Sequence, residues 1–130
     1  MGDDGYHIFC RVKVNGIKCR ALIDTGASKT VLGKPLHQKL NITEFMADMD
    51  NSMTGIHPIG MNIVFAKIDE ISIGKIKFNN LMTGLIDMDH VSKQYESLNI
   101  KPFDLIIGGD ILHKGNAIIN FKDKTLELFP

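Results

Sequence analysis

Apolar and polar residues alternate through the first part of the chain, and this is the pattern of half-buried β-strands. From Ile8 to Val14 the even-numbered positions are apolar, and the positions between them are mostly polar. Asn15-Gly16 follows, a pair that strongly favours a two-residue hairpin turn. The alternation resumes at Ile17 and leads into Asp24. The pattern therefore predicts a β-hairpin whose second strand ends at a carboxylate.

The middle of the chain combines an irregular stretch with further strands. Residues 43–60 have no clear periodicity, which predicts a long exposed loop or a mobile hairpin. Strand patterns return over residues 61–67 and 71–78, and the second contains Gly74-Lys75, which suits a two-residue turn. Residues 81–87 predict another strand.

Short helices and closing strands complete the pattern. A short strand is expected at 30–32, and helical turns are expected at 35–40 and 91–98. A buried strand at 104–107 runs through Gly108-Gly109 into a third short helical stretch. Strands at 117–121 and 125–129 are joined by a turn at 122–124. The chain is therefore expected to be mostly β, with one or two short helices.

Size and charge narrow the possible partners. The 130 residues are 44% apolar, enough to fill the core of one domain spanning 1–130 without a disulfide or metal. Lys plus Arg and Asp plus Glu both number 15, which argues against a nucleic-acid partner. Only a basic patch formed in three dimensions would change that expectation. Met1–Asp4 does not resemble a signal peptide, and no run reaches a membrane span, so a cytoplasmic protein is expected.

The two cysteines flank the predicted hairpin turn. If Asn15-Gly16 sets the register, Cys10 lies opposite Ala21 and Cys19 lies opposite Val12. The cysteine Cα atoms would then be diagonal neighbours about 7–8 Å apart, beyond the usual reach of a disulfide. We expect two reduced core residues, and a redox pair is the alternative.

The strongest chemical signal is the segment from Leu22 to Ser28. It places Asp24 at the end of an apolar strand, directly before the small residues Thr25-Gly26-Ala27-Ser28. Backbone N–H groups and hydroxyls of such a turn can bond the carboxylate. Two interpretations fit these seven residues equally well. Asp24 either caps its own backbone or is a reactive group.

A second motif gives this turn a specific resemblance. Leu105-Ile-Ile-Gly-Gly-Asp-Ile-Leu112 follows some eighty residues later, with Ala117–Phe121 after it. An Asp-Thr-Gly-Ala turn followed at this distance by a hydrophobic-hydrophobic-Gly motif resembles the retropepsin family of aspartic proteases. The likeness covers Val12 to Phe129 and is nearest to small stand-alone bacterial members. It implies an all-β, retropepsin-like closed barrel with one lobe per chain.

The resemblance also implies a mechanism and a set of site residues. Family members of this length form homodimers, so two copies of Asp24 would share one proton and activate a water against a peptide bond. No cofactor or metal is implied. Thr25, Gly26, Ala27 and Ser28 would support the catalytic turn. Residues 51–60 would form a flap, with Thr54, Gly55, Ile56 and His57 near the substrate. Ile106 and Ile107 would line the cleft wall.

The sequence also departs from the viral members of that family. They usually carry an acidic residue at the position of Ser28 and an Arg at the position of Gly109. Both partners are missing together here, so no charge is left unpaired. The departure leaves open how a dimer would be braced.

Other functions are weaker alternatives. A retropepsin-fold module for dimerisation or peptide binding, with little turnover, is the main rival to an endopeptidase, and an unrelated small β-barrel is a third. Asp87-Met-Asp89-His90 could hold a metal, but a solvated loop is the favoured interpretation. No Gly-x-Ser-x-Gly elbow supports a serine hydrolase. The methionines around the expected flap fit either core packing or a peptide-binding surface.

Overall fold

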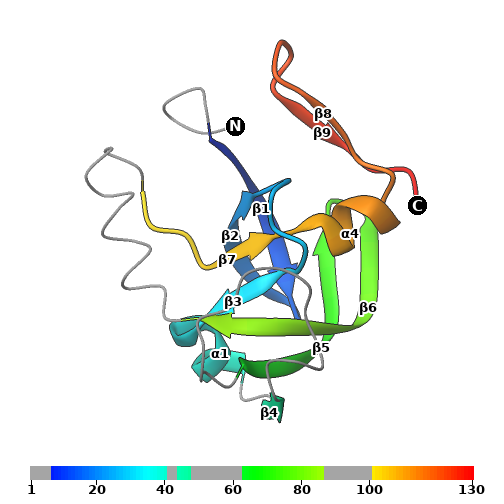
Figure 1. Ribbon diagram of the computed structural model, residues 1–130. Coiled ribbons are helices and arrows are strands. Elements are labelled where there is room, and N and C mark those ends of the chain that lie inside the picture. Colours follow the sequence, from blue (N-terminus) through cyan, green and yellow to red (C-terminus); the bar gives the residue numbers. More distant parts are fainter. Residues whose placement is uncertain (1–6, 41–43, 48–62, 87–100) are drawn as a thin grey trace.

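A computed structural model describes residues 7–40, 44–47, 63–86 and 101–130 (Figure 1). The predicted flap at 51–60 and the predicted helix at 91–98 lie outside these residues. So do four proposed substrate-binding residues, Thr54, Gly55, Ile56 and His57.

Six strands form a closed β-barrel, as the sequence predicted. They follow the order β1 (Ile8–Val14), β2 (Ile17–Ile23), β7 (Leu105–Ile107), β3 (Val31–Gly33), β6 (Ile76–Ile86) and β5 (Ile63–Ile73). The ring closes where β1 pairs with β5 through Lys13–Ser72 and Val14–Ile71. Strand β4 (Glu44–Ala47) lies outside the ring and pairs with β5 alone among the described strands.

The first hairpin has the register that its turn predicted. Val14 pairs with Ile17, Val12 with Cys19, and Cys10 with Ala21. Both turn residues have positive φ, 48° at Asn15 and 84° at Gly16, as a type I′ turn requires. Cys10 and Cys19 are both free thiols, so the expectation of two reduced cysteines is confirmed.

The second hairpin is longer than the sequence pattern suggested. Strands β5 and β6 pair continuously except at Asp69 and Asn80, where separate segments had been expected. Asn80 has a φ of 55°, so the polar pair Asn79-Asn80 bends the strand without ending it. The turn at Gly74-Lys75 is confirmed, with Gly74 at φ 61°. Residues 44–47, expected in an irregular region, form β4, which agrees with the hairpin alternative for that region.

Two short helices and a separate hairpin complete the described fold. Helix α1 (Lys34–Leu40) follows β3, and helix α4 (Gly109–Lys114) follows β7, both where helical turns were expected. Strands β8 (Ile118–Asn120) and β9 (Thr125–Glu127) form a two-stranded sheet that extends away from the barrel (Figure 1).

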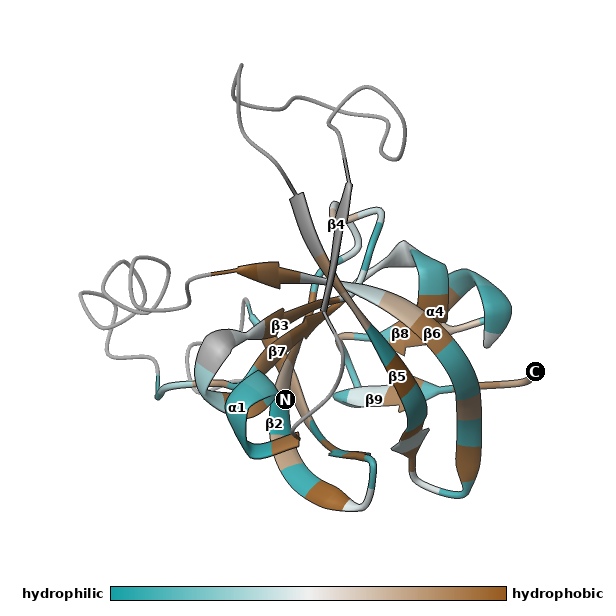
Figure 2. Cartoon of the chain, turned by 90° about the horizontal axis from the view of Figure 1, so that it is seen from below, coloured by the Kyte–Doolittle hydropathy of each residue, from teal (hydrophilic) through white to brown (hydrophobic). Residues whose placement is uncertain are grey.

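The barrel interior is filled by aliphatic side chains. Ile68, Ile71, Leu105, Ile107 and Ile111 are all fully buried. Figure 2 shows hydrophobic segments alternating with hydrophilic ones along the strands that surround this core. A smaller cluster of Phe9, Leu22 and Phe103 packs on the other face of β2. Within the part of the chain that the structure describes, no helix is long and apolar enough to span a membrane.

Candidate active site

Asp24 follows β2 directly and begins a tight turn. Its backbone N–H donates to the Ile107 carbonyl at 3.0 Å, which continues the parallel pairing of β2 with β7. The carboxylate Oδ1 accepts the Gly26 N–H at 2.9 Å, and the Asp24 carbonyl accepts the Ala27 N–H at 3.2 Å. A Cβ at position 26 would lie 3.3 Å from that Oδ1, so the short Gly26 lets the turn fold close to the carboxylate.

The turn at Gly108-Gly109, the second glycine turn, is hydrogen-bonded to the turn at Asp24–Ser28, the first glycine turn. Gly109 donates its N–H to the Ala27 carbonyl at 2.6 Å, and Asp110 donates its N–H to the Ser28 carbonyl at 3.2 Å. The sequence offers no acid–Arg side-chain pair at positions 28 and 109. Backbone hydrogen bonds, Gly109 to Ala27 and Asp110 to Ser28, join the two turns instead.

A buried side-chain pair reinforces this junction. The Thr30 hydroxyl is fully buried, donates to Asp110 Oδ1 at 2.8 Å, and accepts the Gly108 N–H at 3.1 Å. Asp110 Oδ1 also accepts the backbone N–H groups of Thr30 and Ile111, at 3.0 and 2.9 Å. Sequence reasoning assigned no role to Thr30 or Asp110. The acidic residue in the first turn of a helix that follows two glycines was the available signal.

The four turn residues differ in exposure. Thr25, Gly26 and Ser28 are exposed, whereas Asp24 and Ala27 are half-buried. Neither the Thr25 nor the Ser28 hydroxyl has a hydrogen-bond partner among the described residues. A shallow pocket of about 360 Å³ borders the turn, so Thr25 shares one face with α4 and β8. The pocket is lined by Thr25, Gly109, Leu112, His113, Asn116, Ala117 and Ile119.

The proposed cleft-wall residues lie side by side on β7. Ile107 is fully buried in the main core, and its carbonyl holds Asp24 in place. Ile106 is partly buried and packs against the cluster of Phe9, Leu22 and Phe103. Their contact with a substrate stays a prediction.

The described residues offer neither a metal site nor a reactive thiol. No three His, Cys, Asp or Glu side chains among them converge as a metal site. The segment Asp87–His90 lies outside the described part of the chain. Burial raises the pKa of both Cys10 and Cys19 to about 11, and nearby Asp104 adds to the effect at Cys19. Both thiols are therefore protonated at neutral pH and poor nucleophiles.

Comparison with known proteins shows the family to which this chain belongs. The family described as "Aspartyl protease" matches residues 10–111, a range that contains Asp24, Thr30 and the second glycine turn. The chain belongs to this aspartyl protease family, and its fold is retropepsin-like.

Solved structures support the fold. A retropepsin-like aspartic protease from Rickettsia conorii is 21% identical, with a TM-score of 0.55 over 88% of this chain and 75% of that one. The retroviral protease-like domain of Ddi1 from Leishmania major is 15% identical, with a TM-score of 0.58 over 94% and 83%. The EIAV protease, solved with the inhibitor HBY-793, is 19% identical, with a TM-score of 0.53 over 82% and 86%.

One curated relative is a much longer protein. The UBA domain-containing protein Mud1 of Schizosaccharomyces pombe is 24% identical over 123 residues, which make up 95% of this chain. They are only 33% of Mud1, so the chain spans about one third of the length of that relative.

Proposed function

We propose that residues 1–130 make up one aspartic endopeptidase domain that is active as a homodimer, with Asp24 as the catalytic residue. The observation that carries the proposal is the half-buried Asp24 carboxylate at the end of β2, on a turn cross-linked by backbone hydrogen bonds to the second glycine turn. A merely structural Asx-turn has no need of this second turn or of the buried pair beneath it.

The chemistry follows from two such carboxylates placed close together. Like charges a few Å apart do not both ionise, so the pair would hold one proton. The ionised carboxylate takes a proton from a bound water, and that water attacks the peptide carbonyl. The protonated carboxylate donates to the carbonyl oxygen. In this proposal Thr25 would bond its counterpart across the twofold axis, and residues 51–60 would close over the peptide.

The β8–β9 hairpin supports the dimer. Ile118, Phe121 and Phe129 are 51%, 59% and 55% exposed, an unusual concentration of apolar surface on one small hairpin. A two-stranded sheet is marginally stable by itself and gains from packing against further strands. The hairpin follows α4, which borders the same pocket as Thr25. A second copy on this face would cover the apolar side chains and bring the two turns together.

Substitution of the carboxylate tests the activity directly. We expect Asp24→Asn to lower the rate of cleavage of an unfolded protein substrate by roughly a hundredfold or more, because the amide cannot take the proton from water. Specific activity of the wild type should also rise with protein concentration until dimerisation is complete. Cleavage is followed by gel electrophoresis and mass spectrometry from acid to neutral pH.

Asp69→Asn is the matched control, since Asp69 is an exposed carboxylate on β5 far along the chain from the turn. It should cleave like the wild type. Equal cleavage by wild type and Asp24→Asn, at every pH and at concentrations where the protein is dimeric, would exclude Asp24 as the catalytic group.

The second candidate is a retropepsin-fold module that dimerises or binds peptides with little turnover. Its support is the likeness to Mud1, a UBA domain-containing protein, and to one domain of Ddi1. Peptide binding without cleavage by the wild-type dimer would favour this module over the enzyme.

A further inference from the structure

A broad groove lies on the outside of the barrel, between the β1–β2 hairpin and the β5–β6 hairpin. It has a volume of about 1140 Å³ and is lined by parts of 9–13, 16–20 and 70–77, together with Lys101 and Asp104. Figure 2 shows the ends of the two hairpins at the same end of the molecule. The turn of the first hairpin is joined to β5 by the Asn15 N–H, which donates to the Glu70 carbonyl at 2.8 Å. We call this surface the basic groove.

The charge of the basic groove is strongly one-sided. Seven of the chain's 15 Lys and Arg residues line it, against two carboxylates. The chain as a whole is neutral, so the described lining of the groove is far more positive than the average of the sequence. A concave surface with one sign of charge raises the local concentration of oppositely charged ligands. The basic groove is therefore suited to an anionic ligand, and it is a basic patch formed in three dimensions that the sequence totals could not show.

The β1–β2 hairpin places cations directly opposite one another. Arg11 pairs with Arg20 and Lys13 with Lys18 in the antiparallel register. Like charges at opposed positions destabilise a sheet. No ion pair to any of these four residues is found within the described ranges. A bound anion would relieve this repulsion.

The Arg20 side chain gives a second, independent indication that the basic groove binds an anion. Its Nε and Nη2 are buried and have no hydrogen-bond partner among the described residues. Its guanidinium carbon lies 4.2 Å from the centroid of the Phe9 ring, which fixes the plane of the group at the groove wall. Buried donors without an acceptor are costly. A carboxylate is an acceptor whose two oxygens match the guanidinium fork.

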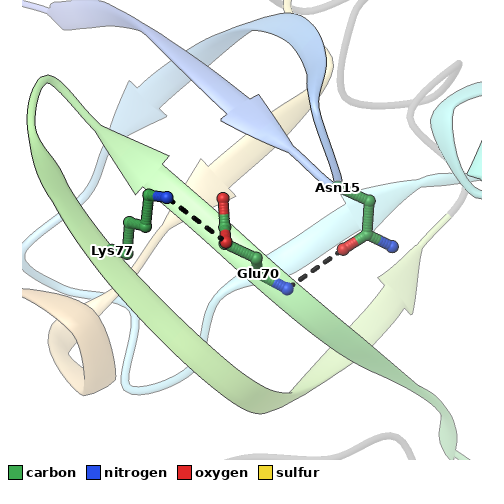
Figure 3. A network of polar contacts seen from close by, with 3 residues as sticks. All are labelled: Asn15, Glu70 and Lys77. Atoms are coloured by element: carbon green, nitrogen blue, oxygen red, sulfur yellow. Dashed lines mark hydrogen bonds and ion pairs between the residues drawn. The ribbon is translucent and has the colours of Figure 1, made fainter.

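The two carboxylates in the groove are already engaged. Glu70 Oε2 lies 4.0 Å from Lys77 Nζ, and the Glu70 backbone N–H donates to Asn15 Oδ1 (Figure 3). Asp104 Oδ2 accepts the Arg20 backbone N–H at 2.9 Å. The Glu70 carboxylate thus contacts a lysine of its own hairpin, and the Asp104 carboxylate holds its segment against β2. Two carboxylates against seven cations leave the described lining with a net positive charge.

The lining favours a peptide over a nucleic acid. Among the described residues, Phe9 is the one aromatic residue lining the groove; it is only 6% exposed and is covered by Arg20 and Phe103. The described lining therefore offers no exposed ring for base stacking, the usual partner of a positive groove in single-strand binding. Cys10 and the aliphatic stems of the lysines give apolar contacts between the charges. We propose that the basic groove binds an extended acidic segment of a partner protein. Binding there does not depend on the protease activity proposed above.

Fluorescence anisotropy with a short labelled Glu-rich peptide tests this binding, and the same peptide with Gln for every Glu is the reference probe. The full chain should bind the Glu peptide more tightly, and added salt should weaken that binding. Lys13→Glu/Lys18→Glu should weaken it by roughly tenfold or more. This variant replaces one like-charge pair by another at exposed positions, so the fold should persist.

Lys39→Glu/Lys67→Glu is the matched control, because both lysines are exposed, lie outside the groove and give the same change in net charge. It should bind the Glu peptide within about threefold of the wild type. The Asp24→Asn variant should bind as the wild type does, which separates this test from that of catalysis. Hydrogen exchange of the wild type with peptide should slow in residues 9–20 and 70–77.

Three results would overturn the proposal. Equal binding of the Glu and Gln peptides would show that the ligand need not be acidic. Equal weakening of binding by the two double variants would show that the peptide does not bind in the basic groove. The third result is that a single-stranded RNA oligonucleotide or phosphatidylserine vesicles bind more tightly than the Glu peptide, and that Lys13→Glu/Lys18→Glu abolishes this binding. It would show that the groove binds a phosphate ligand and not an acidic protein segment.

Discussion

Thr30 is the residue on which the spacing of the two glycine turns depends. Its buried hydroxyl is both donor to Asp110 and acceptor from Gly108, so it joins two distant segments of the chain through one oxygen atom. The partners lie about 80 positions away in the chain. Sequence patterns could place Asp24 in a turn because its neighbours are local. They could not reveal Thr30, which looks like an ordinary strand residue until the fold brings Asp110 to it.

Gly108 and Gly109 offer a sharp residue-scale prediction. A Cβ at Gly108 would lie 2.7 Å from the Lys29 backbone and 2.8 Å from the Ala27 carbonyl, whereas a Cβ at Gly109 would meet that carbonyl at 3.4 Å. We expect Gly108→Ala to lower the free energy of unfolding by about 1–3 kcal/mol or more. Gly109→Ala should be nearly neutral, because Ala is favourable in the first turn of α4.

Urea unfolding followed by circular dichroism measures both variants. The cost at Gly108 comes from backbone contact, which no side-chain rotation can relieve. Similar stabilities for the two variants would mean that the turns are not held as closely as the distances imply. Gly108→Ala should also reduce cleavage by the proposed enzyme, since the turn at Gly108 touches the one that carries Asp24.

At the scale of elements, hairpins were predictable and long-range pairings were not. Asn15-Gly16 and Gly74-Lys75 encode their turns locally, so β1–β2 and the β5–β6 turn followed from the sequence. The polar Asn79-Asn80 looked like a break, but Asn80 adopts positive φ and the ladder continues beyond it. The basic groove was invisible in the sequence because six of its seven cations come from two hairpins more than fifty residues apart, and the seventh, Lys101, lies beyond both.

The thiols of the β1–β2 hairpin predict a change in stability at alkaline pH. Unfolded thiols lose their protons near pH 8.5, whereas in the folded chain the pKa of both is raised to about 11. The folded state therefore binds more protons between these values, so stability is complete below about pH 8.5 and falls as the pH rises towards 11.

Thermal unfolding across this range measures the effect. Cys10→Ala/Cys19→Ala should lose less stability than the wild type between the two pH values, because the titrating groups are gone. Lys and Tyr side chains titrate in both proteins and cancel in the comparison. Parallel curves for the two proteins would contradict the role of thiol burial.

At the scale of the whole molecule, exposed apolar side chains gather on β8–β9, and positive charge gathers in the basic groove between the other two hairpins. The barrel separates a surface suited to a second copy from one suited to an acidic partner. The fold class was predictable because strand periodicity and two glycine motifs agreed. The separation of surfaces depends on how the closed barrel places its hairpins.

Sedimentation velocity tests the proposed dimer surface. We expect Ile118→Asp/Phe121→Asp to raise the dimer dissociation constant by more than about tenfold, because charges would replace apolar side chains that a second copy covers. Met82→Asp is the control, since Met82 is also exposed, at 38%, but lies on β6. A wild type that stays monomeric at every concentration would contradict the homodimer.

The pairing of β2 with β7 affects the order in which parts of the chain fold. Ala21 pairs with Leu105, so this contact closes a loop of more than eighty residues, whereas both hairpins form from neighbours. Contacts between distant segments cost more chain entropy and form slowly. We expect the hairpins to assemble early and the junction beneath Asp24 to assemble last. A nascent or partly folded chain would therefore lack the assembled turn around Asp24, and the proposed protease activity would be delayed until folding is complete.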